Sequence, residues 1–178
     1  TIASGVVSAN YPDTIATGMK YYYVISAISG GVETPNSPEA TANLPYPWQT
    51  QDIGTVGVTG SANYNGGTFG MTAGGADIQG TADAFRYVYA PATGNCTIIA
   101  RVASEQNVNA WSKAGVMIRE SLNANAANAF VGLTPGNGTT WQYRSSTGGA
   151  TTYNNTSGLN APYWVKLVRS GNTFTGYR

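Results

Sequence analysis

The residue types that carry acid–base and metal chemistry are few in this chain. It has no histidine and one cysteine, Cys96. A Ser-His-Asp or Cys-His centre, a histidine zinc site and a thiolate zinc cluster therefore cannot be built from it. Cys96 opens a strand-like run and is predicted to be a small core residue. Carboxylates are the remaining groups with catalytic potential.

The acidic residues do not form a recognisable catalytic pair. Glycoside hydrolysis needs two carboxylates about 5–10 Å apart, but no strand here carries closely spaced acids. Glu120 follows Arg119 at a predicted strand end, where an ion pair or solvent exposure is expected. The prediction is a non-catalytic chain, with a glycoside hydrolase fragment as the least favoured alternative. The eight acids are Asp13, Glu33, Glu39, Asp52, Asp77, Asp83, Glu105 and Glu120.

Three aspartates are candidate metal ligands. Asp77 and Asp83 flank the short stretch 79–81, and Asp52 precedes a glycine turn. Calcium takes six to eight oxygen ligands, including carboxylates and backbone carbonyls. One interpretation is a structural Ca²⁺ site in these loops. The other is that the aspartates cap turns through side-chain-to-backbone hydrogen bonds.

Aromatic residues could bind sugar, because pyranose C–H faces stack on flat rings while amides and guanidinium groups bond to hydroxyls. In the run 141–144, Trp141 and Tyr143 share one face of a strand, and Gln142 and Arg144 share the other. Trp141 and Tyr143 either bind a ligand or pack in the core. If they are buried, Gln142 and Arg144 are expected to line an outer face as polar ligand contacts.

Loop-borne aromatics are further ligand candidates. Trp111 follows a polar stretch and is predicted to be an exposed platform, and Tyr153 sits in a polar loop where it could stack on a ligand. Trp48 is expected to anchor two domains. Trp164 leads an apolar strand pattern and is expected in the core.

The low content of charged residues and the lack of long apolar runs limit the partners and the location that the chain can have. Charged residues make up 10% of the 178 residues, well below the usual quarter, and the net charge is +1. No basic cluster favours nucleic acid, and no run approaches the ~18 apolar residues of a membrane span. The chain begins at Thr1, so an export signal is expected to lie upstream or to have been removed. An extracellular, secreted or cell-surface location is predicted.

Period-two alternation predicts an all-β fold, a sandwich or jelly roll built from short strands. The segment 121–128 is asparagine-rich and is expected to be a loop. Two prolines in 44–48 place a domain boundary there. Predicted strands cover 21–27, 84–89, 97–102, 114–119, 130–133 and 140–145, followed by a hairpin of 164–169 with 173–178.

Residues 1–44 resemble the C-terminal half of a bacterial fibronectin type III domain, through the runs 11–14, 21–28 and 30–37. Tyr21 matches the tyrosine corner of that sandwich. The resemblance implies that the row of Tyr21, Tyr23 and Ile25 is exposed unless missing strands are supplied. Those strands would come from upstream residues or from a neighbouring copy of the chain.

After a linker at 45–50, residues 51–178 form the second predicted domain. Together with the linker's end, from residue 48, they resemble a concanavalin A-like β-sandwich found beside glycoside hydrolase modules in secreted bacterial proteins. Gln79 and Arg86 stand where such domains often carry Trp and His, and the family pattern continues past Arg178, so the domain is expected to be C-terminally truncated. The matching runs are 48–54, 74–78, 81–85, 111–120 and 163–169.

These resemblances imply a non-catalytic carbohydrate-binding or adhesion module of a larger secreted bacterial protein. The expected partner is a polysaccharide or cell-surface glycan, with Trp111, Trp141, Gln142, Tyr143, Arg144 and Tyr153 as ligand contacts. Structural calcium is often present in such sugar-binding domains. The alternative is a structural subunit of an extracellular fibre or array, in which neighbouring copies complete one another's strands.

Overall fold

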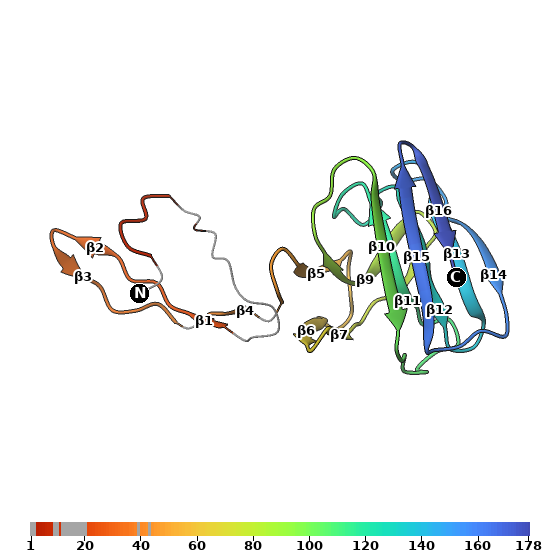
Figure 1. Ribbon diagram of the computed structural model, residues 1–178, viewed down its shortest axis with the longest axis horizontal. Coiled ribbons are helices and arrows are strands. Elements are labelled where there is room, and N and C mark those ends of the chain that lie inside the picture. The colour runs from red at the N-terminus through yellow and green to blue at the C-terminus, as the bar shows by residue number, and fades with distance from the viewer. Residues whose placement is uncertain (1–2, 9–10, 12–20, 39, 43) are drawn as a thin grey trace. The chain divides into compact units, whose positions relative to one another are not determined.

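The computed structural model describes residues 3–8, 11, 21–38, 40–42 and 44–178 (Figure 1). Every regular element in these residues is a β-strand, which confirms the all-β prediction. Because the structure has no helix there, none of the described residues belongs to a helix that could cross a membrane. Pro12, Asp13, Thr14 and Glu39, which enter the sequence predictions, lie outside the described residues.

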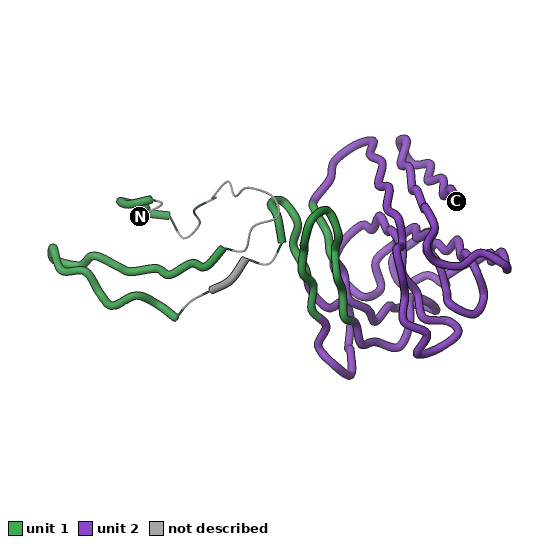
Figure 2. Tube along the Cα trace, turned by 60° about the horizontal axis from the view of Figure 1, so that its bottom comes forward, with its two compact units in different colours: residues 1–50, 61–72, 88–90 green, residues 51–60, 73–87, 91–178 purple. Residues whose placement is uncertain are grey.

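The chain divides into two compact units (Figure 2). The first contains residues 1–50, 61–72 and 88–90, and the second contains 51–60, 73–87 and 91–178. The main division thus falls at the end of the predicted linker. The segments 61–72 and 88–90, which the sequence assigned to the second domain, group with the first unit.

The first unit is built from small antiparallel ladders. Its described N-terminal part contains two of them, β1 with β4 and β2 with β3, and a hairpin of β6 with β7 completes the set. The ring of Phe69 packs edge-on against both Trp48 and Tyr64, with centroids 5.3 and 4.9 Å apart. The strands are β1 (Tyr21–Tyr23), β2 (Ile28–Ser29), β3 (Val32–Glu33), β4 (Ala40–Ala42), β6 (Ser61–Asn65) and β7 (Thr68–Thr72).

The second unit is a β-sandwich. One sheet has the order β10-β15-β16 and the other β11-β12-β13-β14, and all pairs are antiparallel. Gly171, at a φ of 59°, allows the tight turn between β15 and β16. The strands are β10 (Cys96–Val102), β11 (Ala114–Arg119), β12 (Asn128–Thr134), β13 (Gly138–Arg144), β14 (Thr152–Thr156), β15 (Tyr163–Ser170) and β16 (Thr173–Tyr177).

The main core lies between these two sheets. Alternate residues point inward because successive side chains of a strand face opposite sides of its sheet. Trp141 is half-buried beside this core, against the backbone of Gly176, where an added Cβ would lie 2.5 Å from the indole ring. The buried members are Val102, Val116, Ala129, Val131, Leu133, Val165 and Leu167.

A third layer covers the other face of the four-stranded sheet. It consists of β5 (Gln49–Ile53), β9 (Ala82–Tyr89) and β8 (Asp77–Gln79), in the order β5-β9-β8. Ile78 from this layer packs on Met117 and Phe130, with the rings of Phe85 and Tyr87 beside them. Every residue of β12 is consequently buried, since the strand has protein on both faces.

The strands predicted in the second domain are confirmed to within a residue or two at their ends, and so is the loop over 121–127. The strand predicted over 21–27 was too long, because β1 ends at Tyr23. Three burial expectations were also wrong. Trp164 is 61% exposed and does not lie in the core. Cys96 is only half-buried. Gln142 and Arg144 do not line an outer face, because the third layer covers them.

Candidate functional site

Asp83 is the centre of a buried charge network in the second unit. Its carboxylate receives two hydrogen bonds from Arg144, at 2.6 Å to Oδ1 and 3.0 Å to Oδ2. Arg119 Nη1 lies 3.4 Å from Oδ2, and Asn128 Nδ2 donates to the same oxygen at 3.2 Å. The side chains of Asp83 and Arg144 have no exposed surface. Two guanidinium groups therefore share one carboxylate in the interior.

Arg144 also ties together three loops. Its guanidinium donates to the backbone carbonyls of Ala126, Gly149 and Gly80, at 3.0, 3.1 and 3.3 Å. Arginine suits this task because its five N–H donors have a fixed fork geometry. This residue holds the fold together and does not reach an external ligand.

Gln142 is likewise internal. It is 2% exposed, and its Nε2 donates to the carbonyl of Ile78 at 3.0 Å, which links β13 to β8. The sequence placed Gln142 and Arg144 on one face correctly. It could not show that a third layer closes over that face.

Arg119 occupies the edge of the same network. Burial lowers the pKa of Arg119, and the nearby Asp83 carboxylate opposes that shift. Its guanidinium lies over the ring of Phe85, 5.3 Å from the centroid, and 6.0 Å from that of Tyr87. The Arg119 side chain is only 2% exposed, and cation–π contacts of this kind stabilise such a desolvated cation.

The other two candidate metal ligands are also paired with cations. Asp52 lies 3.3 Å from Arg86 and accepts from the backbone N–H of Gly60 at 3.1 Å. Asp77 forms an ion pair with Lys113 and accepts from the N–H of Ile78 at 2.7 Å. These backbone bonds match the turn-capping interpretation.

The three aspartates do not fit a calcium site. Each is neutralised by its own arginine or lysine, and Ca²⁺ would have to displace those cations. Among the described residues, no group of three or more His, Cys, Asp or Glu side chains converges to hold a metal ion. Asp52, Asp77 and Asp83 are thus distributed over separate ion pairs.

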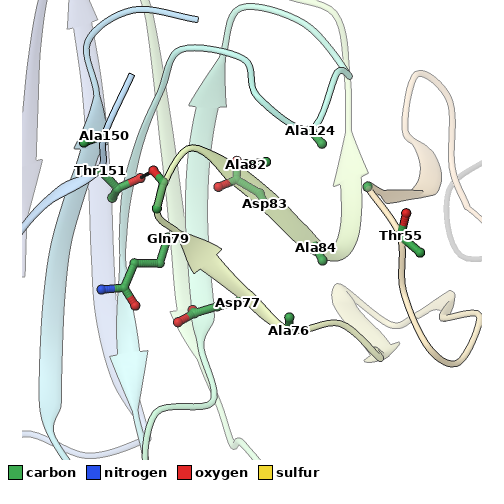
Figure 3. Close-up of a pocket in the computed structure, with 12 residues that line it drawn as sticks. Thr55, Ala76, Asp77, Gln79, Ala82, Asp83, Ala84, Ala124, Ala150 and Thr151 are labelled. Carbon is green, nitrogen blue, oxygen red and sulfur yellow. Dashed lines mark hydrogen bonds between the residues drawn. The ribbon is translucent and has the colours of Figure 1, made fainter. Parts of the chain in front are cut away.

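An open hollow of about 730 Å³ lies beside the β8–β9 turn (Figure 3). Its lining is mostly alanine and glycine, and its polar members are Thr55, Asp77, Gln79, Asp83 and Thr151. The carbonyl of Gly80 is occupied there by bonds from both the N–H and the hydroxyl of Thr151, each at 2.9 Å. The hollow has no aromatic wall on which a sugar could stack.

The flat exposed surfaces are elsewhere. Trp111 is 48% exposed and Tyr153 is 54% exposed, in agreement with their predicted accessibility. Tyr143 is 39% exposed and stands 6.1 Å from the half-buried ring of Trp141, centroid to centroid. Because Tyr153 pairs with Gln142 in the ladder, it lies on the opposite sheet face from Trp141 and Tyr143. The structure therefore does not gather the predicted ligand contacts into one site.

Two further carboxylates complete the described acids of this unit. Burial raises the pKa of Glu105, in the loop after β10. Glu120 accepts a 2.6 Å hydrogen bond from the hydroxyl of Thr147.

Sequence reasoning missed Trp164 as an exposed aromatic. The pattern that could have found it is the phase of alternation in β15: Val165 and Leu167 are apolar, so Trp164 shares the opposite face with Lys166. No family model, curated protein or solved structure matches the chain.

Proposed function

We propose that the second unit is a concanavalin A-like sandwich that binds polysaccharide or cell-surface glycan without transforming it, within an extracellular or secreted bacterial protein. The first unit, with its fibronectin type III-like sequence, would serve as a spacer. The observation that carries this proposal is the exposure of Trp111, Tyr143 and Tyr153 on a well-packed sandwich. Flat aromatic rings held open to solvent are what sugar C–H faces stack on.

The ion pairs of the second unit favour binding over hydrolysis. A glycosidase needs one carboxyl that protonates and another that attacks or activates water. Here Asp52, Asp77 and Asp83 are each engaged by a cation, and Asp83 is buried. Such carboxylates are poorly placed to exchange protons with a substrate.

Stacking on scattered rings gives weak individual contacts. Affinity for a surface would then come from several modules acting together, because tethering raises the effective concentration of each binding event. A spacer unit between modules is consistent with this mode of action.

Affinity electrophoresis through gels containing a panel of polysaccharides tests the proposal. We expect retardation by at least one polysaccharide, and we expect W111A or Y153A to weaken it about three- to tenfold, since each removes a stacking surface worth roughly 1 kcal/mol. Val58→Ala is the matched control, because Val58 is an exposed apolar residue of the same unit. Free migration of the wild-type protein on every polysaccharide would reject glycan binding.

A structural role is the second candidate, and the first unit supplies its supporting observation. Tyr22, Val24, Ile25, Ile28 and Val32 are all exposed there, beside two-stranded ladders. Exposed apolar residues on short strands favour pairing with another copy of the chain. Light scattering over a range of concentrations, followed by negative-stain microscopy, would reveal regular polymers if this role holds.

A further inference from the structure

The β10-β15-β16 sheet has an outer face directed away from the core. Ile98, Val102, Val165 and Leu167 belong to the core or pack on it, so the residues between them point to solvent. We define the outer face by five such side chains, whose strands lie side by side in Figure 1. They are Ile99, Arg101, Trp164, Lys166 and Tyr177.

The ladder register places an aromatic ring and a cation next to each other. Trp164 is directly opposite Arg101 on the neighbouring strand, which puts their Cβ atoms about 5 Å apart. Lys166 lies between Ile99 and Tyr177, with its Nζ 4.0 Å from the centre of the Tyr177 ring. Arg101 and Lys166 are diagonal neighbours, roughly 7–8 Å apart.

These side chains are accessible. Trp164 is 61% exposed, Ile99 57% and Tyr177 45%, and Arg101 is also exposed. Among the tryptophans of this unit, Trp164 is more exposed than Trp111 and than the half-buried Trp141. Because Trp164 lies on the middle strand of its sheet, its exposed indole ring is open to contact with a ligand.

The outer face is positively charged. The remaining residues on it, at 97, 168, 170, 173 and 175, are Thr, Val, Ser, Thr and Thr, so it carries two cations and no acid. Neither Arg101 nor Lys166 forms a salt bridge with a described acid. The whole second unit has eight Lys and Arg against five Asp and Glu. Three of those acids, Asp52, Asp77 and Asp83, form ion pairs with four of the cations.

We propose that the outer face is a second binding surface, selective for acidic polysaccharides that carry uronate-type carboxylates. The sugar's C–H face stacks on Trp164. The Arg101 guanidinium then donates two parallel N–H hydrogen bonds to the sugar carboxylate, a geometry for which arginine is suited. The Lys166 ammonium pairs with the carboxylate of the next uronate along the polysaccharide. A neutral glycan would leave both cations unused.

Two other polyanions fit this surface less well. Nucleic-acid binding proteins carry clustered basic faces that neutralise many phosphates. Recognition of anionic lipid uses clusters of about 4–8 cations. The outer face offers two cations beside an indole ring, which matches a polymer that alternates apolar ring faces with single carboxylates.

Isothermal titration with polygalacturonate, and with the same polymer after methyl esterification, tests the proposal. We expect W164A and R101Q each to weaken binding of polygalacturonate about tenfold, and esterification to weaken wild-type binding by a similar factor. Arg178→Gln is the matched control, since it removes one exposed cation outside the outer face. It should change affinity less than twofold. Urea unfolding of each variant verifies that the fold is unchanged.

Several results would overturn the outer-face site. Equal losses for R101Q and R178Q would indicate non-specific attraction. If W164A binds with wild-type affinity, the sugar does not stack on Trp164. If DNA or phosphatidylserine vesicles bind as well as polygalacturonate, the surface is assigned to another polyanion. The proposed function is independent: binding of neutral glycans through Trp111 or Tyr153, with no preference for the acidic polymer, rejects the outer-face site alone.

Discussion

The substitution Asp83→Asn is expected to lower the free energy of unfolding of the second unit by about 3–5 kcal/mol. The Asp83 side chain is completely buried and is the shared partner of Arg119 and Arg144. Asparagine has nearly the same shape, so the loss comes from charge. Without the carboxylate, two desolvated guanidinium groups face each other with no counterion, which is far more costly than losing an exposed ion pair.

Urea unfolding followed by tryptophan fluorescence measures this effect. Glu120→Gln is the matched control, because it neutralises an exposed carboxylate that accepts a hydrogen bond from the hydroxyl of Thr147, and it should cost less than about 0.5 kcal/mol. The double variant D83N/R144Q should cost less than the sum of the two single changes, since the second change removes one stranded charge. A loss for D83N as small as that for E120Q would contradict the buried network.

The residues of this network show where sequence reasoning stopped. Alternation along β13 placed Gln142 and Arg144 together on one face, and the structure has them so. Their burial depends on β8 and β9, which pack over them from more than 50 residues earlier in the chain. No local pattern links Asp83 to Arg144. Asp83 was therefore interpreted as a turn cap or calcium ligand instead of an ion-pair partner.

The strands were predictable because their alternation is strong in the sandwich. The hairpin of β15 and β16 was identified from apolar periodicity and the turn at 170–172. The hairpin of β6 and β7 was not identified, because 61–72 is rich in Gly, Asn and Thr and has few apolar residues to show a phase. Its grouping with the first unit depends on long-range contacts.

The cations of the second unit fall into two groups, those paired in the interior and those left on the surface. Four cations of the second unit, namely Arg86, Lys113, Arg119 and Arg144, pair with aspartates at its layer contacts. In a chain with so few charged residues, the exposed cations that remain stand out against a neutral Thr- and Asn-rich surface. Arg101 and Lys166 lie beside Trp164 on this surface. Two cations on an otherwise neutral surface attract an anionic ligand and fix its position there.

Tyr87 provides the second large effect, which appears at alkaline pH. Burial raises the pKa of Tyr87 to about 12, and the positive charge of Arg119 opposes the shift only in part. Its hydroxyl donates to the carbonyl of Met117 at 3.1 Å, a bond that requires the protonated form. In the unfolded chain the same phenol titrates near its ordinary pKa of about 10.

The direction of the pH effect follows from this difference. Below pH 10 the phenol is protonated in both states, and its contribution to stability is fully present. Between pH 10 and pH 12 the unfolded chain loses the proton while the folded protein keeps it, so stability falls by up to roughly 3 kcal/mol. Above pH 12 both states are ionised, and the loss is complete.

Comparing wild-type protein with Tyr87→Phe isolates this contribution, because all other groups titrate alike in the two proteins. Near neutral pH the variant should be less stable by about 1 kcal/mol, since the Met117 carbonyl loses its donor. As pH rises from 10 to 12 the wild type should lose its advantage and become the less stable of the two. Val58→Ala, which changes an exposed apolar residue with no titratable group, is the control, and its stability should run parallel to that of the wild type across this range. A constant difference between wild type and Y87F across this range would mean that Tyr87 titrates alike in the folded and unfolded chain.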